Sequence, residues 1–148
     1  MKKYLLAIAT FMWIAFIFMN SLQTGVESGE VSSKITEVVI KVLNLININL
    51  DFNTTAIFIR KCAHVFEYFI LGILFALTYI NMIGNLNYRI IYTFLSALVV
   101  SISDEIIQLY VPGRVGAVTD VLIDTIGIVL GIILILLIIK IRKKRTEV

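Results

Sequence analysis

Residues 118–139 have the sequence VTDVLIDTIGIVLGIILILLII, an apolar run that carries only two charged residues, Asp120 and Asp124, both near its start. A basic segment, KIRKKR, follows directly from Lys140. An α-helix rises about 1.5 Å per residue, so a run of this length spans the roughly 30 Å hydrocarbon core of a bilayer. The stretch therefore predicts a membrane-spanning helix with acids toward one end and a basic flank at the other.

Three further apolar runs precede this one in the 148-residue chain, at 4–22, 65–82 and 90–111. Hydrophobic residues make up 59% of the chain, and the mean hydropathy of +0.98 exceeds the usual range of soluble proteins. We therefore predict an all-α membrane protein, a single domain (1–148) built as a four-transmembrane-helix bundle. The spanning helices are expected at about 4–22, 56–82, 89–111 and 117–140.

Basic residues gather at both ends of the chain, with Lys2 and Lys3 before the first apolar run and four more within 142–145 after the last. Positively charged flanks of spanning helices stay on the cytoplasmic side, so both termini are expected in the cytoplasm, as an even number of crossings requires. These flanks account for the net charge of +3, and we expect no nucleic-acid partner. Residues 1–19 also fit a signal peptide, but no small-x-small cleavage site follows them, so we predict an uncleaved helix.

The long segment between the first two spanning helices contains a helical pattern of its own. Its apolar residues are Ile35, Val38, Val39, Val42 and Ile46, and they recur opposite Lys34, Glu37, Lys41 and Asn44. Ser32 or Ser33 could provide the N-cap. This predicts an extra amphipathic helix in the first outer loop that lies on the membrane surface. Packing on the bundle as a lid explains the pattern equally well.

Helical rise places the acids in depth when counted from the inner end of each helix. Asp104 comes out about 22 Å above Arg89, and Asp124 comes out about 24 Å above the basic end of the last helix. Glu67 comes out about 20 Å and His64 about 24 Å above the inner end of their helix. This predicts one layer of ionisable groups near the outer leaflet, with none comparable in the inner half.

Residues three or four positions apart share a helix face, so the spacing also predicts which side chains point together. In the last helix, one stripe is formed by Asp120, Asp124, Gly127 and Gly131, and we expect it to face the bundle because small residues permit close helix contact. Two other shared faces are His64, Glu67, Tyr68 and Leu71, and Ser101, Asp104, Glu105 and Gln108. Four hydroxyl residues are expected to bond to their own helix backbone: Ser101, Ser103, Thr119 and Thr125.

Several short motifs follow one another in order. They are Asn20, Ser21 and Gln23, then 60–68 (RKCAHVFEY), 103–108 (SDEIIQ), 112–114 (PGR), and Asp120 with 124–127 (DTIG). A single His-x-x-Glu pair is a weak signal, but this combination at membrane ends is specific. With these motifs the sequence resembles the VanZ-like family of bacterial membrane proteins, whose founding member is associated with resistance to the glycopeptide teicoplanin. The resemblance implies a multi-pass protein of the bacterial cytoplasmic membrane connected with the cell envelope or with glycopeptide susceptibility.

Several functions remain open at this point. The first is binding or modification of a membrane lipid or a lipid-linked cell-wall precursor at the outer leaflet, with Arg60, Lys61 and Arg114 gripping a phosphate. The second is a hydrolase or transferase in which His64 acts as general acid or base, and a carboxylate such as Glu67 or Asp104 tunes its pKa or holds a divalent cation. A transporter is disfavoured because the inner half lacks ionisable groups. The last is a buried polar cluster that fixes helix register without a ligand.

The sequence therefore yields candidate residues and leaves open whether the protein is an enzyme. One imidazole with carboxylates suits Mg, Mn or Zn without selecting among them, and no established metal-ligand spacing such as His-Glu-x-x-His occurs. We thus assign no cofactor and no metal site, although the residue types permit a divalent cation without a specific motif for it. Cys62, the single cysteine, forms no internal disulfide. The candidate catalytic residues are His64, Glu67 and Asp104. The candidate ligand-binding residues are Ser21, Gln23, Arg60, Lys61, Tyr68, Glu105, Gln108, Arg114, Asp120 and Asp124.

Overall fold

The computed structural model describes residues 2–146, and it describes side chains from 4 to 145. The side chains of Lys2 and Lys3, which entered the orientation prediction, lie outside the described residues. The elements are α1 (Lys2–Ser21), α2 (Gly25–Asn44), α3 (Phe52–Ile80), α4 (Leu86–Leu109) and α5 (Val118–Thr146). All of these except α2 are long and apolar enough to cross a membrane. The prediction of an all-α protein with four long apolar helices is confirmed for the described residues.

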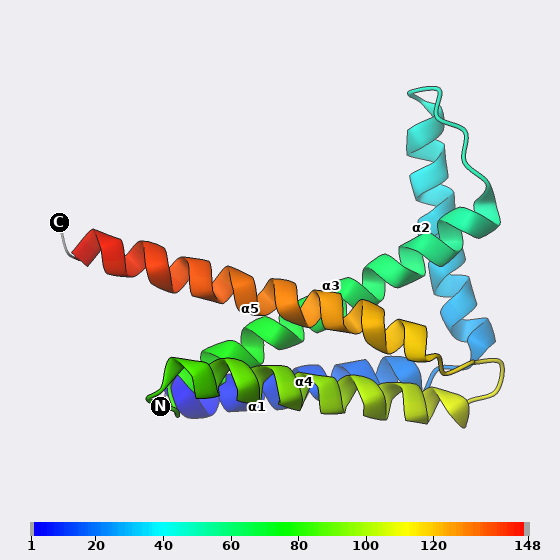
Figure 1. Cartoon of the computed structure of the whole chain (residues 1–148). Coiled ribbons are helices and arrows are strands. Elements are labelled where there is room, and N and C mark those ends of the chain that lie inside the picture. The colour runs from blue at the N-terminus through cyan, green and yellow to red at the C-terminus, as the bar shows by residue number, and fades with distance from the viewer. Residues whose placement is uncertain (1, 147–148) are drawn as a thin grey trace.

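The arrangement centres on α3, which contacts each of the other four helices. In Figure 1, α1 and α4 run side by side, whereas α2 points across their direction at the far end of the bundle from the two chain termini. Hydrogen bonds tie α1 to α3, since the Trp13 indole donates to the Glu67 carbonyl at 2.9 Å and Thr10 and Thr78 share a bond at 3.1 Å. These bonds fix α1 against α3, and α2 lies at the opposite end of the bundle from the two termini (Figure 1).

Two spanning helices are longer than predicted. Helix α3 begins at Phe52 rather than near residue 56, because Asp51 acts as its N-cap and accepts from the Thr54 N–H at 2.8 Å. Helix α5 continues to Thr146 rather than ending near residue 140. Basic side chains in its last turn interact favourably with the negative end of the helix dipole, which supports the extension.

The N-cap prediction for α2 was wrong. Its N-cap is Thr24, not Ser32 or Ser33, which lie inside the helix. The Thr24 side chain accepts from the Glu27 N–H while the Glu27 carboxylate accepts from the Thr24 N–H, so the two residues form a capping box. Helix α2 consequently starts close to the end of α1 and runs to Asn44, so Ile46 falls in the turn after it.

Glycines let α3 and α5 approach closely. A Cβ at Gly127 would lie 2.3 Å from the Val65 carbonyl oxygen, and one at Gly131 would lie 2.5 Å from that of Phe69. These two glycines therefore face α3, as the predicted stripe requires. The close approach brings the N-terminal part of α5, which carries Asp124, against the part of α3 that carries His64.

Candidate functional site

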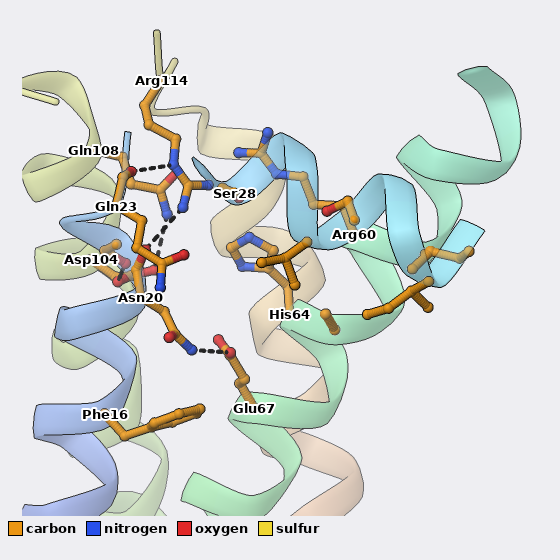
Figure 2. Close-up of a pocket in the computed structure, with 16 residues that line it drawn as sticks. Phe16, Asn20, Gln23, Ser28, Arg60, His64, Glu67, Asp104, Gln108 and Arg114 are labelled. Carbon is orange, nitrogen blue, oxygen red and sulfur yellow. Dashed lines mark hydrogen bonds between the residues drawn. The ribbon is translucent and has the colours of Figure 1, made fainter. Parts of the chain in front are cut away.

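A cavity of about 290 Å³ lies at the end of the bundle where α2 begins, between α1, α2, α3 and α4 (Figure 2). Helix α2 contributes Ser28, Val31, Ser32 and Ile35 to its wall, so this wall is partly apolar. The polar wall comes from α1 and the short link after it, from α3 and α4, and from the loop before α5. The polar residues are Asn20, Ser21, Gln23, Arg60, His64, Glu67, Asp104, Gln108 and Arg114.

A second cavity of about 250 Å³ adjoins the first, because Arg60 and His64 line both. It lies between α3, α5 and the loop before α5, and Lys61 and Asp120 also line it. Asp120 occupies the first turn of α5, where a negative charge interacts favourably with the helix dipole. Two cavities thus share one wall formed by a guanidinium and an imidazole.

The acids on α3 and α4 each receive hydrogen bonds from other polar groups. Asn20 of α1 donates to Glu67 Oε1 at 2.8 Å, as the dashed line between them in Figure 2 marks. Asp104 accepts from the Ser21 hydroxyl and from the Gln108 amide, the latter at 3.3 Å. The end of α1 is therefore fastened to α3 and α4 through the polar layer.

His64 pairs with Asp124 of α5. Its Nδ1 lies 3.2 Å from Asp124 Oδ1, and the Ser101 hydroxyl donates to Asp124 Oδ2 at 2.6 Å. The sequence hypothesis had named Glu67 or Asp104 as the carboxylate beside His64, whereas the geometry gives that position to Asp124. The reason is the glycine contact between α3 and α5, which sets the rotation of the two helices. Only 11% of the His64 side chain is exposed and none of Asp124.

Further oxygens of the layer are buried. The Ala117 N–H donates to Glu105 Oε2 at 2.7 Å, but Glu105 Oε1 has no hydrogen-bond partner among the described residues. The same holds for Tyr68 Oη and Gln108 Oε1. Buried polar atoms usually have partners, so three such oxygens in one region are unusual.

The two arginines at the cavity form no ion pair with an acid among the residues that the structure describes. Arg114 donates through Nε to the Gln23 carbonyl at 3.1 Å and through Nη2 to the Asn20 carbonyl at 3.0 Å. Burial and the neighbouring Arg60 lower the pKa of the Arg114 guanidinium, although a guanidinium stays protonated in proteins. Within the part of the chain that the structure describes, the His64–Asp124 pair is the only ion pair closer than 4.0 Å. Both guanidinium groups therefore keep their positive charge for another anion.

The structure brings all the sequence-predicted site residues into this end of the bundle, in the two cavities or in the buried layer beneath them. Sequence reasoning missed two members. Ser101 was expected to bond to its own helix but donates to Asp124, whereas Ser103 and Thr125 do bond to their own helices. Asn20 was noted only as part of a motif, yet its side chain and its carbonyl both make site contacts. Its position directly before Ser21 was the available signal.

Comparison with known proteins gives one match. The profile of a family described as VanZ/LLP1 matches residues 6–139, which is nearly the whole chain. No curated protein and no solved structure matches.

Proposed function

The chain belongs to the VanZ/LLP1 family, and from this premise we propose that its cavity binds the anionic head group of a lipid or lipid-linked cell-wall precursor at the outer leaflet of the bacterial cytoplasmic membrane. The observation that carries the proposal is the pair of arginines on one cavity wall. Arg60 and Arg114 come from different elements, lie close enough to lower the pKa of Arg114, and lack an acidic partner among the described residues. An anion between them would relieve this repulsion.

Arginine suits such a ligand. Its planar guanidinium presents paired donors that match the oxygens of a phosphate. Two donors of Arg114 already hold backbone carbonyls, so this side chain is fixed in place before a ligand arrives. Arg60 makes no hydrogen bond to another described residue and is free to turn toward a ligand. The two residues thus combine a fixed and an adjustable cation.

The apolar part of a lipid also finds a surface at this cavity. Val31 and Ile35 of α2 line the cavity wall opposite the polar groups, and both have exposed side chains. A site that combines a few convergent polar groups with apolar walls is typical of binding pockets. In this proposal α2 lies on the membrane surface as an amphipathic helix and covers the head group, which unites the surface-helix and lid interpretations.

Binding can be measured with the full chain in detergent by native mass spectrometry. The probes are a polyprenyl phosphate, phosphatidylglycerol and the uncharged lipid diacylglycerol. We expect the two phosphate lipids to remain bound after the uncharged lipid is lost, and Arg60→Gln to weaken their binding about tenfold. Lys34→Gln is the matched control, since Lys34 is an exposed cation on α2 outside the cavity wall. Equal retention of all three probes would contradict the proposal.

The proposal extends to antibiotic susceptibility. A protein that engages a lipid-linked cell-wall precursor would alter the access of a glycopeptide to that precursor. A host that expresses the chain should therefore tolerate more teicoplanin, and Arg60→Gln or His64→Ala should remove the effect at equal membrane abundance. If expression of the wild-type chain leaves the teicoplanin susceptibility of the host unchanged, the proposal is restricted to lipid binding.

A second candidate function rests on the His64–Asp124 pair. A carboxylate that hydrogen-bonds one ring nitrogen of a histidine orients the imidazole and leaves the other nitrogen for proton transfer. His64 borders both cavities, so a hydrolase or transferase acting on a bound lipid head group is compatible with this geometry. Incubation with lipid-linked cell-wall precursors, followed by mass spectrometry of the products, separates turnover from binding alone.

A further inference from the structure

Four side chains with metal-ligating atoms converge in the buried layer beside the cavity. They come from three helices: His64 of α3, Asp104 and Glu105 of α4, and Asp124 of α5. One ligand atom of each lies within 4.8 Å of the others. We propose that these four side chains bind a divalent cation, a site that goes beyond the head-group binding described above.

The distances suit such an ion. Opposite oxygens around an octahedral Mg²⁺ lie about 4.2 Å apart, which is twice a bond of about 2.1 Å, and adjacent oxygens lie closer. The four ligand atoms are therefore nearly close enough to surround one ion, and side-chain rotations that shorten the longest separations by a few tenths of an ångström would allow all four to coordinate it. Because the ligands come from α3, α4 and α5, a bound cation would also join the outer ends of three helices.

Charge balance supports a cation here. Three carboxylates lie together, and the only ion-pair partner within 4.0 Å among the described residues is His64, which faces Asp124. An uncompensated charge at membrane depth is energetically costly, so buried acids in a membrane protein usually have a partner. Arg114, the loop cation that lines the cavity, donates to the backbone carbonyls of Gln23 and Asn20 and forms no ion pair with these acids among the described residues. A divalent cation would compensate the acids where the chain's own cations do not.

Buried oxygens without a hydrogen-bond partner also support a ligand at this cluster, independently of the acids. Gln108 is 2% exposed, its amide nitrogen donates to Asp104, and its Oε1 has no partner among the described residues. Tyr68 is fully buried, lies four residues after His64 on the same face of α3, and has a hydroxyl without a partner among the described residues. The Gln108 amide oxygen can accept a hydrogen bond from a water molecule bound to the cation, and the Tyr68 hydroxyl can accept such a bond or donate one to a ligand of the cation.

Outer hydrogen bonds hold the ligands in place, as they do around established metal sites. Ser101 donates to one oxygen of Asp124, Ser21 donates to Asp104, and a backbone N–H donates to Glu105 Oε2. Glu105 Oε1 remains available. A set of three carboxylates with one imidazole is mainly hard in character, which favours Mg²⁺ or Mn²⁺ and also accommodates Zn²⁺.

Metal binding alone tests the inference, without a lipid. The full chain in detergent is stripped with EDTA and titrated with MgCl₂, MnCl₂ and ZnCl₂ by isothermal calorimetry. We expect saturable binding of one cation per chain for at least one of the three. Asp124→Asn and Glu105→Gln should weaken it at least tenfold, whereas Glu37→Gln, an exposed acid on α2, should stay within twofold of the wild type.

Two results would overturn the inference. The first is that the wild-type protein, shown to be helical and monodisperse, binds none of the three cations. The second is that the Asp124→Asn variant binds a cation as tightly as the wild type. If the variants fail to fold, electron spin echo spectroscopy of Mn²⁺ on the wild type decides. Nitrogen coupling from an imidazole supports the site, since His64 is the only histidine, and an oxygen-only signal contradicts it. None of these outcomes depends on lipid binding, which can fail or succeed separately.

Discussion

The polar layer is fixed by single side-chain bonds between helices, and Asn20 is the clearest case. Its side chain donates to Glu67 on α3, and its carbonyl accepts from Arg114 in the loop before α5. One residue thereby connects α1, α3 and the loop. Such a contact depends on the rotation of both helices, so the sequence could predict the depth of Asn20 and Glu67 but not their pairing.

The two serines of α4 provide a matched pair for testing the metal site. Ser101 is buried and donates to Asp124, whereas Ser103 is half-buried and donates to a carbonyl of its own helix. We expect Ser101→Ala to lower Mn²⁺ affinity by about 10- to 100-fold, because a ligand loses its outer hydrogen bond. Ser103→Ala should leave the calorimetric affinity within twofold. If the two substitutions change the Mn²⁺ affinity equally, the hydrogen bond from Ser101 does not position Asp124 for metal binding.

At the scale of helices, the sequence predicted what repeats along one helix but not what two helices set jointly. The four apolar runs gave the spanning helices, and the Gly127 and Gly131 stripe faces α3 as expected. The choice of Asp124 as the partner of His64 depends on the rotation between α3 and α5 and could not be read from either helix. The start of α2 could have been found, since Thr24 and Glu27 fit the capping-box pattern.

The contact between α3 and α5 predicts a strong asymmetry among glycine substitutions. A Cβ at Gly127 would meet the Val65 carbonyl oxygen at 2.3 Å, so Gly127→Ala must push the helices apart. We expect it to destabilise the protein by roughly 1 to 3 kcal/mol, as overpacking usually does. Gly29→Ala on α2 is the control, because nothing lies within 4 Å there and alanine favours a helix by about 0.5 to 1 kcal/mol. Reversible unfolding in detergent, followed by circular dichroism, should show a lower free energy of unfolding for Gly127→Ala and an equal or higher one for Gly29→Ala.

The capping box of α2 predicts a pH dependence confined to that helix. Hydrogen bonds from the backbone and the side chain of Thr24 lower the pKa of Glu27 below its ordinary value of 4.5. Its contribution to helix stability is therefore fully present above pH 4.5 and is lost as the pH falls through the lowered pKa. Amide hydrogen exchange at Thr24, corrected for intrinsic rates, should accelerate at low pH. Glu27→Gln cannot titrate, so a similar acceleration in that variant would refute the explanation.

The whole molecule has one polar end, where α2, the two cavities and the acidic cluster lie, and one end that carries both termini (Figure 1). The apolar, outward-facing side chains between these ends suit contact with lipid acyl chains. Which end faces the cytoplasm follows from the positive-inside rule, because the basic last turn of α5 lies at the terminal end. We therefore expect the cavity to open toward the outer leaflet.

Cysteine labelling tests this orientation, since the chain has a single cysteine that can be removed. In a Cys62→Ala background, Glu37→Cys on α2 should react with a membrane-impermeant maleimide in intact cells. Lys144→Cys near the end of α5 should react only after the cells are permeabilised. Both positions are exposed in the structure, so a difference between them reports the side of the membrane rather than burial in the protein. The reverse pattern would place the cavity at the inner leaflet. A precursor lipid whose cell-wall unit has already been exported could not reach it there, so the cavity would have to bind lipids of the cytoplasmic leaflet.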